Sequence, residues 1–474
     1  MKSLDAVLRA RASALALSLL PALAACSQDK GEPRKDGGTT TPTSGGATSS
    51  SGGATSSSGS TTSSSGGATS TPSDGPAPPT MSDFCSLPGS IVFDDSGRHV
   101  VGGDTGQLPW LTLQKGFCAH HFAKLTSVRE IRFGPKGELF ASSPGRTCVG
   151  GAGIGLGAVV MIPDDDGDGL GDAPIQILSN LEAAHGFAFA PGVIYYQATV
   201  TQIRKAPYDG GRAPIANAAS AGEAVADITV YQSDVHWTKT IDIADDGTVY
   251  VTNGGDNGSM CGATQPFQGG ILKIDGSPGG HQVASGFRNP IRVRCQHGHN
   301  NCFALELARD GSGSIGGREK LVLVREGDDW GHPCCATKDL PFSDIGAGAD
   351  CSKVASEDNA FVIGSTPFGL DFVPSSWPAP YAGGVVIALH GVFAQWQGAK
   401  VVAISADPVT GMPIKTSTTG STPSGPISDL ATGWDDGTRA HGRPTVATFG
   451  PDGRLYIGDD TANEIFWIAP VVSH

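Results

Sequence analysis

The chain contains 474 residues and carries a formal net charge of −14. This acidic balance disfavours a nucleic-acid-binding function, because such proteins present basic patches to the phosphate backbone. Ten cysteines suggest disulfides if the chain is exported, since disulfides persist in oxidising compartments.

The N-terminus predicts export. Residues 1–25 combine a basic start with the apolar stretch Ala14–Ala22, which is too short to span a bilayer and therefore indicates a signal peptide. The run Leu23-Ala24-Ala25-Cys26 resembles a bacterial lipobox, in which the cysteine is lipidated and becomes the new N-terminus. We therefore expect a membrane-anchored lipoprotein, periplasmic or at the cell surface, held only by the lipid on Cys26. An ordinary signal sequence that is cleaved nearby is the alternative.

Residues 26–82 predict a flexible tether. Ser-Ser-Gly-Gly-Ala-Thr units recur there, and such a segment has too little apolar surface to fold. About fifty residues of flexible coil reach roughly 40 Å, so the tether would hold the remaining domain away from a membrane. That domain, residues 83–474, is long enough to bury one large core.

A pattern of strand, tight turn and strand recurs within this domain. Its flanks carry β-branched and aromatic residues, and a glycine supplies the positive φ that the turn needs. Four copies are clear: Ile131–Phe140, Phe187–Tyr195, Ile241–Tyr250 and Val446–Tyr456. The first three turns are about 55 residues apart, close to the ~40–50-residue period of a propeller blade plus insertions. The repeat therefore predicts an all-β fold, a β-propeller.

Two less regular hairpins bring the predicted number of blades to six. One joins Ile291–Cys295 to Cys302–Leu305, and the other joins Pro367–Phe372 to Gly384–Leu389. Five or seven blades remain possible, because the insertion Leu340–Ser365 interrupts the rhythm. Propellers carry their sites on the loops of one face, around the central axis, but the fold alone does not define a function.

An acidic run after the first hairpin predicts a calcium loop. Asp164, Asp166 and Asp168 place oxygen ligands at alternate positions, and Gly167 allows the chain to turn. The loop is not an EF-hand, because Ile175 stands where the twelfth-position glutamate would be. A solvated acidic turn without a metal is the alternative.

Spacing along the chain predicts two disulfides. Cys295 and Cys302 bracket a hairpin turn and could bridge it. Cys351 could pair with either Cys334 or Cys335. Both predictions depend on export of the chain.

The remaining cysteines are harder to assign. Cys118 and Cys148 form a further candidate pair. If Cys26 is lipidated, an odd number of cysteines remains, so at least one thiol would be free. Zinc binding by Cys334-Cys335 with His332 is an alternative, although adjacent cysteines give poor metal geometry.

Four polar stretches could carry chemistry. A histidine beside a tryptophan is usually structural, and an arginine that precedes a strand usually forms a surface ion pair. In a propeller, however, such positions open onto the axis. The stretches are Ser233–Thr240, Ser285–Pro290, Glu326–Cys334 and Gly433–Ala462.

Together, and in this order, these stretches resemble the glucose/sorbosone dehydrogenase family. Its members are soluble six-bladed propellers that use pyrroloquinoline quinone (PQQ), and the resemblance extends from about Leu113 to Ile468. Gln114–Phe117 is similar to the family's opening strand, and Gly286–Pro290 is similar to its most specific signature. Leu323–Pro333 resembles the segment that follows, and Ala431–Asp460 resembles the C-terminal blade.

The resemblance implies roles for five residues. His236 matches the base that takes the hydroxyl proton while hydride passes to the quinone, and Arg288 matches the arginine that polarises the quinone C5 oxygen. Asn289 matches a neighbour of the cofactor, Arg443 matches an arginine that binds cofactor carboxylates, and Asp459 matches an aspartate of the same pocket. Calcium would chelate the quinone. We expect these five residues to converge on one mouth of the propeller.

The implied function is PQQ-dependent oxidation of a sugar, with an unidentified electron acceptor. Two departures bear on the substrate: His390–Gln395 lacks the Trp and Arg of the family's His-Gly-Ser-Trp-Asn-Arg motif, and Arg309–Gly317 has a diluted acidic cluster. Two other functions remain open. One is a surface-tethered propeller that binds carbohydrate or protein without catalysis, and the other is a calcium-dependent hydrolase of the lactonase kind.

Overall fold

The structure is a computed structural model. It describes residues 84–471 apart from 145–156, 232–235, 257, 259, 263–264, 278, 358, 393–397, 416–426 and 438. The predicted signal peptide, Cys26 and the tether lie outside the described residues. The described part belongs to one compact unit, Pro79–His474. None of its helices is long and apolar enough to cross a membrane.

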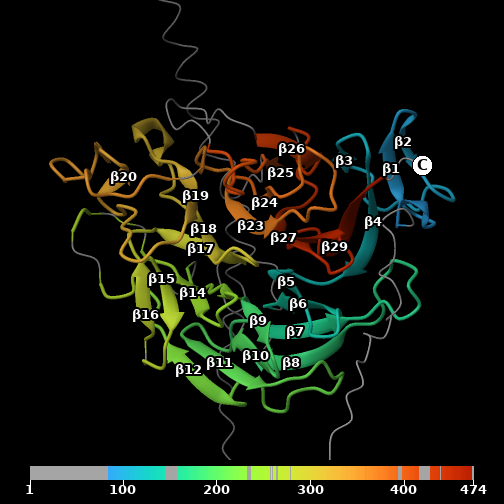
Figure 1. The fold of residues 1–474 in the computed structure, drawn as a ribbon, viewed down its shortest axis with the longest axis horizontal. Helices are drawn as coiled ribbons and strands as arrows, with labels where there is room; N and C mark the ends of the chain where they lie inside the picture. The colour runs from blue at the N-terminus through green and yellow to red at the C-terminus, as the bar shows by residue number, and fades with distance from the viewer. Residues whose placement is uncertain are drawn as a thin grey trace, which may run out of the picture. The chain divides into compact units, whose positions relative to one another are not determined.

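The described residues form six antiparallel sheets around a common axis (Figure 1). Blades 1 to 3 consist, from the axis outwards, of β5 (Glu130–Phe133), β6 (Leu139–Ser143), β7 (Gly157–Ile162) and β8 (Ile175–Leu181); β9 (Phe187–Ala190), β10 (Val193–Gln197), β11 (Gln202–Pro207) and β12 (Glu223–Asp227); and β13 (Ile241–Ile243), β14 (Val249–Asn253), β15 (Gly270–Ile274) and β16 (His281–Ala284).

Blades 4 to 6 carry the additions to this plan. They consist of β17 (Asn289–Gln296), β18 (Asn301–Leu307), β19 (Glu319–Leu323) and β22 (Asn359–Phe361); β23 (Pro367–Phe372), β24 (Val385–Leu389), β25 (Lys400–Ile404), β26 (Ile427–Thr432) and β3 (Thr112–Leu113); and β27 (Pro444–Phe449), β28 (Leu455–Asp459), β29 (Glu464–Pro470), β4 (Phe117–Lys124), β1 (Ile91–Asp94) and β2 (Gly97–Val100). Between β19 and β22 lies a small hairpin, β20 (Cys335–Thr337) with β21 (Leu340–Pro341), and the short 3-10 turns η1 (Phe84–Ser86) and η2 (Ser312–Ile315) complete the described elements.

The first strand of each blade lies nearest the axis. These inner strands are β5, β9, β13, β17, β23 and β27. Because neighbouring strands are antiparallel, the start of an inner strand and the end of the second strand lie at the same face. We call this face the mouth, and we call the opposite face, with the hairpins between first and second strands, the turn face.

The predicted hairpins are confirmed. Gly137, Gly192, Gly247 and Gly453 have φ values of 84°, 75°, 85° and 85°, which β-branched residues do not tolerate. The two irregular hairpins are β17–β18 and β23–β24, so the count of six blades holds.

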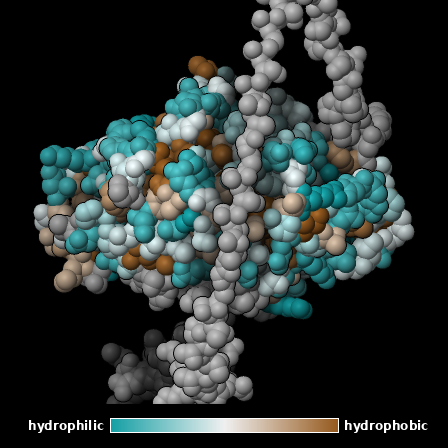
Figure 2. All heavy atoms as spheres, turned by 90° about the horizontal axis from the view of Figure 1, so that it is seen from below, coloured by the Kyte–Doolittle hydropathy of each residue, from teal (hydrophilic) through white to brown (hydrophobic). Residues whose placement is uncertain are grey.

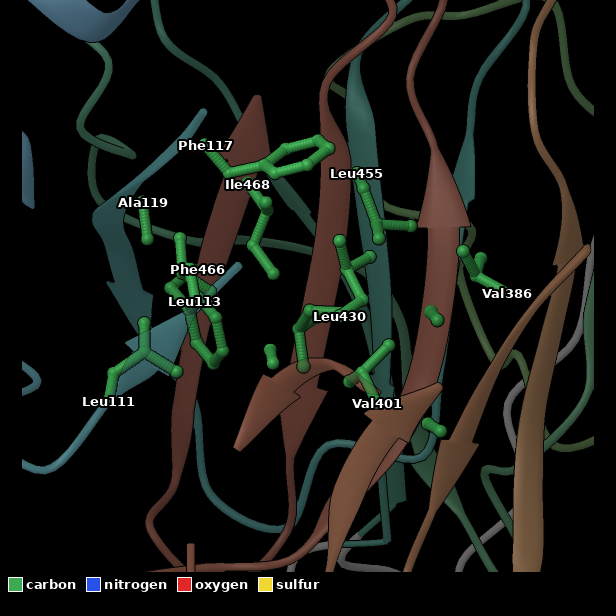
Figure 3. Close-up of a cluster of buried hydrophobic side chains, with 14 of the residues drawn as sticks. Leu111, Leu113, Phe117, Ala119, Val386, Val401, Leu430, Leu455, Phe466 and Ile468 are labelled. Carbon is green, nitrogen blue, oxygen red and sulfur yellow. The ribbon is translucent and has the colours of Figure 1, made fainter. Parts of the chain in front are cut away.

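The blades pack against each other through strands that are buried on both faces. β24 is buried at all of its positions, which explains why its sequence is a continuous apolar run and not an alternation. Between blades 5 and 6, Val386 and Val401 face Leu455 and Phe466 (Figure 3). Truncating a buried leucine of this kind to alanine typically costs about 2–5 kcal/mol.

Blade 6 closes the ring with strands from both parts of the chain. β29, near the C-terminal end, pairs along its length with β4, and β4 pairs in turn with β1. A disulfide joins Cys85 to Cys118, which lies on β4. Closure of this kind leaves the ring no free seam between its first and last blades.

Two of the predicted disulfides are confirmed and one prediction is wrong. Cys295 bonds Cys302, and Cys335 bonds Cys351. The pairing of Cys118 with Cys148 is wrong, because η1 packs on β4 and brings Cys85 to Cys118.

A fourth disulfide, Cys261–Cys334, was not predicted. It joins two loops that are far apart in sequence, so spacing along the chain could not indicate it. The zinc alternative is wrong, because Cys334 and Cys335 are each bonded to another cysteine. The eight cysteines of the described residues all form disulfides, and Cys148 lies outside those residues.

Hydrophilic residues are spread over the visible face in Figure 2, with small hydrophobic patches between them. Large hydrophobic side chains with more than two-fifths of their surface exposed are few among the described residues; they are Leu170, Met260, Leu340, Val362 and Val409.

Candidate active site

His236 lies at the mouth, shortly before β13, and its side chain is buried. Its Nδ1 is 2.6 Å from the carbonyl oxygen of Gly255. Because a carbonyl oxygen can only accept a hydrogen bond, Nδ1 of the neutral ring carries the proton and Nε2 carries the lone pair. A histidine in this tautomer can take up a proton at Nε2, as a general base must.

The loop after β14 brings His236, Arg288 and Asn289 together. The N–H of Gly255 donates to the carbonyl of Arg288 at 2.7 Å, so one residue contacts both His236 and Arg288. At Gly254, an added Cβ would lie 2.7 Å from the Cβ of His236 and 2.9 Å from Oδ1 of Asn289. Only a glycine lets the backbone pass between these two side chains.

An exposed carboxylate orients the guanidinium of Arg288. Nη2 donates to Oδ2 of Asp310 at 2.7 Å, and the Asp310 side chain is 81% exposed. The backbone N–H of Arg288 donates to Oε1 of Glu306 at 3.0 Å, and Lys320 Nζ donates to the other oxygen of Glu306 at 2.6 Å. Glu306 thus fixes the backbone, while Asp310 could yield its place to an anionic group of a ligand.

Buried polar atoms without a partner gather at the mouth. Among the described residues, nothing bonds Oδ1 of Asn289, Oγ1 of Thr238 or Nε of Arg129. These residues stand at the starts of the inner strands of blades 4, 3 and 1. A buried polar atom left unpaired costs about 1–3 kcal/mol, so such a cluster indicates that a polar ligand or water completes the site.

A second group of polar residues surrounds Arg443, which lies just before β27. Its Nη2 donates to Nδ1 of His390 at 2.7 Å, and its Nε is 3.3 Å from the His390 carbonyl oxygen. Nε2 of His390 is 3.3 Å from Oδ1 of Asp460, whose Oδ2 is 3.1 Å from Nη1 of Arg129. Burial lowers the pKa of Arg443 to about 9, helped by the charge of Arg129.

Asp459, the last residue of β28, is held by three donors. They are Nε1 of Trp434 at 2.8 Å and the backbone N–H groups of Thr461 at 2.9 Å and Ala462 at 2.6 Å. Burial raises the pKa of Asp459 to about 6. These donors use both carboxylate oxygens to shape the loop after β28, and direct contact between Asp459 and a cofactor stays a prediction.

Rings connect the two groups across the axis. Phe368 lies 4.6 Å from the ring of His390 and 6.2 Å from the ring of His185, measured between centroids. His185 lies 6.1 Å from the ring of Trp237, which follows His236 in the chain. The five residues predicted from the sequence thus all stand at the mouth, as two groups that share a ring-lined floor.

Below this floor, paired charges fill the axis. Glu130 of β5 contacts both Arg132 and Arg292, and Arg132 donates to Asp242 of β13 at 2.9 Å. All four side chains are buried. A similar pair, Arg294 with Asp371 at 2.9 Å and 3.0 Å, joins β17 to β23. These buried pairs join the inner strands of blades 1, 3, 4 and 5.

The predicted calcium loop lies elsewhere. Asp164, Asp166 and Asp168 follow β7, at the turn face, and one oxygen of each lies within 4.8 Å of the others. Burial raises the pKa of Asp164, a shift that a bound cation would oppose. An ion held there could not contact a ligand at the mouth, so calcium at this loop and calcium on a quinone would be separate sites. Both stay predictions.

Two buried groups near the mouth titrate close to neutral pH. Burial raises the pKa of Glu319 to about 8, against the effect of N–H donors from Thr366 and Gly364. Burial also lowers the pKa of Lys239 to about 7, and its Nζ donates to Oδ1 of Asn253 at 2.8 Å. Perturbed groups of this kind cluster at functional sites.

Sequence reasoning missed Arg129, His185, Asp460 and the role of His390. One signal could have found three of them. Arg129 and His185 stand just before inner strands, as Arg288 does, and Asp460 directly follows Asp459 at the end of a second strand. Aligning the hairpins by blade position would have placed these residues at the mouth.

No protein-family model matches the chain, and no curated protein matches it. Solved structures do. A Trichoderma reesei enzyme of carbohydrate-active enzyme family AA12 superposes with a TM-score of 0.61 at 17% identity, over 77% of this chain and 98% of its own.

Two quinone-containing structures also match. The PQQ domain of Coprinopsis cinerea pyranose dehydrogenase, in its holo form, gives a TM-score of 0.56 at 16% identity, over 76% of this chain and 97% of its own. The PQQ-bound aldose sugar dehydrogenase of Streptomyces coelicolor gives 0.51 at 15% identity, over 76% and 97%. These identities show a shared fold, and the propeller predicted from the resemblance is that fold.

Proposed function

We propose that this protein is a PQQ-dependent dehydrogenase that oxidises a sugar at the mouth of the propeller. One observation carries the proposal: Gly254 and Gly255 link the imidazole of His236, protonated at Nδ1, to the backbone of Arg288 and pass beside Asn289, in a fold shared with PQQ-containing sugar dehydrogenases. A propeller that only binds has no need of a base, two buried arginines and unpaired polar atoms at one place.

The residues present suit an anionic, planar cofactor. Arg288 and Arg443 offer guanidinium groups for oxygen and carboxylate groups, and a planar fork of donors suits carboxylates. Asn289 has a buried side-chain oxygen that none of the described residues satisfies. When bound, PQQ would supply the acceptor for the hydride that leaves the sugar.

The chain itself would supply proton transfer and electrostatic stabilisation. Nε2 of His236 would accept the proton of the sugar hydroxyl, while Gly255 holds the ring through Nδ1. The resulting imidazolium would keep both ring protons satisfied, one by the Gly255 carbonyl and one by the substrate oxygen. Arg288 would stabilise negative charge that develops beside it, and a buried cation acts strongly because little water screens it.

The lactonase alternative has less support. A hydrolase of that kind would need carboxylates at the axis to hold a metal. The axial carboxylates of the described residues, Glu130, Asp242 and Asp371, each contact an arginine. Releasing one of them for a metal would leave a buried arginine without its partner.

The test is reconstitution. The purified protein is titrated with PQQ in the presence of calcium, and a panel of sugars is then scanned with an artificial electron acceptor. We expect saturable quinone binding and turnover with at least one sugar. A protein that binds no PQQ under these conditions would contradict the proposal and favour the non-catalytic, surface-tethered binding propeller.

We also propose a location for the protein. The disulfides fit an exported protein, and we propose that lipid on Cys26 anchors it. Replacing Cys26 with serine should then release the protein from membranes without unfolding the propeller, and a salt wash of the membrane fraction followed by immunoblotting checks this.

A further inference from the structure

His390 is the residue of the altered His-Gly motif that the proposed function leaves unused. It follows β24 at the mouth, is 2% exposed, and packs on Phe368. It contacts Arg443 twice, through Nδ1 at 2.7 Å and through its carbonyl oxygen at 3.3 Å, and it contacts Asp460 through Nε2 at 3.3 Å.

The partners of His390 define its tautomer. A guanidinium can only donate, so Nδ1 facing Arg443 must hold the lone pair, and the proton of the neutral ring lies on Nε2 facing Asp460. Burial, with the charge of Arg443, lowers the pKa of His390 to about 3. Although burial acts the other way on Asp460, Arg129, His390 and Arg443 hold the pKa of that carboxyl far below its usual range. The ring therefore stays neutral with one tautomer at ordinary pH.

This arrangement orients Arg443. Two hydrogen bonds to one residue fix the plane of the guanidinium, and both acceptors are neutral, so these bonds do not neutralise its charge. Asp460 holds the imidazole from its far side and is itself held by Nη1 of Arg129 at 3.1 Å. A carboxylate in place of His390 would orient the arginine as well but would cancel the charge that an anionic ligand needs.

We propose that His390 is a positioning residue: it accepts from Arg443 and donates to Asp460, and so presents the Arg443 guanidinium to a carboxylate group of the ligand at the mouth. The inference rests on the proposed function, because PQQ is the carboxylate ligand considered. It assigns a role to a residue that contacts the cofactor only through Arg443.

Two substitutions separate the two hydrogen bonds. In His390→Asn the amide oxygen can replace Nδ1 and accept from Arg443, whereas in His390→Gln the amide nitrogen can replace Nε2 and donate to Asp460. Quenching of intrinsic fluorescence in the full-length protein measures the Kd for PQQ. We expect His390→Asn to stay within about threefold of wild type and His390→Gln to weaken binding about tenfold or more.

His120→Gln is the matched control. His120 is also buried, its two ring nitrogens face the backbone carbonyl oxygens of His121 and Pro88, and its ring stacks on Trp467 away from the mouth. Its substitution should leave the Kd unchanged. Equal weakening by both His390 substitutions, with intact folding by circular dichroism, would overturn the proposal, because a merely structural role predicts no difference between them.

A measurement without any ligand tests the contact between His390 and Arg443 separately from the proposed function. The protein is labelled with ¹⁵N-histidine, and long-range ¹H–¹⁵N correlation identifies the tautomer of His390, with His390→Gln used for assignment. We expect the Nε2-protonated form without titration between pH 5 and pH 8. The opposite tautomer, or titration within this range, would overturn the proposal. If wild type binds no PQQ, the proposed function fails, and this spectrum alone decides whether His390 holds Arg443.

Discussion

At the level of single residues, the proposed chemistry depends on which nitrogen of His236 carries the proton. The Gly255 carbonyl keeps the proton on Nδ1, so Nε2 is the basic nitrogen of the neutral ring. A glutamine at this position could still donate to Gly255 but could not serve as a base.

We therefore expect His236→Gln to lower kcat by roughly 10²–10⁴ while PQQ affinity changes little, since a positioned base contributes about that factor. Single-turnover kinetics with saturating PQQ measure the effect. His297→Gln is a suitable control, because His297 is exposed and bonds Asp245 at the turn face. A His236→Gln enzyme with wild-type turnover would remove His236 from the mechanism.

Arg288 and Arg443 should differ in the constant they change. Arg288→Ala should lower kcat, because Arg288 would stabilise charge that forms only in the transition state. Arg443→Ala should mainly weaken PQQ binding and leave turnover at saturation nearly unchanged, because a carboxylate contact is equal in ground and transition states. Comparing the Kd for PQQ with kcat at saturating PQQ in both variants tests this. The same pattern in both would contradict the separate roles.

The sequence predicted the residues that local motifs expose and missed those that only the ring brings together. His236, Arg288 and Asn289 belong to short motifs that pointed to a site only together and in their order along the chain. Arg129 and Asp460 are more than three hundred residues apart and meet only because blade 6 closes against blade 1. No local pattern reports that contact. The series of contacts from Arg129 through Asp460 and His390 to Arg443 therefore could not be predicted from the sequence.

At the level of secondary structure elements, the first residue of β19 couples stability to pH. Glu319 has a folded-state pKa of about 8 instead of the usual 4.5, because burial disfavours its charge. A raised pKa in the folded state means that the stability it contributes is complete below about pH 4.5 and is lost as pH rises towards 8.

We expect Glu319→Gln to remove this loss. The Tm of wild type should fall relative to that of the Gln variant between pH 5 and pH 8, and the two should converge at lower pH. Thermal unfolding followed by circular dichroism at several pH values measures the difference. A constant offset across the range would show that Glu319 does not titrate there.

The loop between β7 and β8 gives a second prediction. If Asp164, Asp166 and Asp168 bind calcium, adding calcium at millimolar concentration should raise the Tm. By mass action, the folded state gains about 2.7 kcal/mol of stability when the calcium concentration is one hundred times the Kd. Asp166→Asn with Asp168→Asn should abolish this rise. Magnesium is the control cation, since it tolerates irregular oxygen sites poorly. An equal rise of the Tm in the double variant would show that calcium binds at another site.

Hairpins were predictable because glycine, β-branched residues and spacing act locally. Loop-to-loop links were not. Cys261 and Cys334 pair because the loop after β14 folds over the insertion after β19, and neither loop has a pattern of its own. Cys334 bonds Cys261, and Cys335 bonds Cys351. Because the adjacent cysteines bond different segments, the sequence alone could not show which of them pairs with Cys351.

At the level of the whole molecule, buried ion pairs at the axis connect blades that are not neighbours in sequence. Glu130 of blade 1 contacts Arg292 of blade 4, and Arg132 of blade 1 contacts Asp242 of blade 3. Removing one member of such a pair leaves a buried charge uncompensated.

We expect Glu130→Ala to lower the free energy of unfolding by about 3–5 kcal/mol, the usual cost of breaking a buried pair. The control is Lys205→Ala, which removes an exposed pair with Glu223 and should cost about 0–1 kcal/mol. Urea unfolding of both variants measures the costs. Equal effects would mean that water enters the axis and screens these charges.

The number of blades followed from the period of the hairpins, but the way the ring closes did not. β4 and the β1–β2 hairpin precede the first repeat, and their sequences do not show that they complete the last blade. Closure is decided by pairing between β29 and β4, a contact between distant parts of the chain. Contacts between residues far apart in the sequence cost more chain entropy than local contacts, and no local sequence pattern predicts them.

The Cys85–Cys118 bond also decides how the domain meets a mechanical pull. A force applied to the chain before Phe84 passes through this bond into β4 and does not first peel β2 and β1 from the edge of the sheet. β4 is hydrogen-bonded on both sides, to β1 and to β29. The hydrogen bonds of β4 to β1 and to β29 would therefore share the force. In a propeller anchored through its N-terminal segment, a pulling force would therefore act on blade 6, where the pairing of β4 with β29 closes the ring.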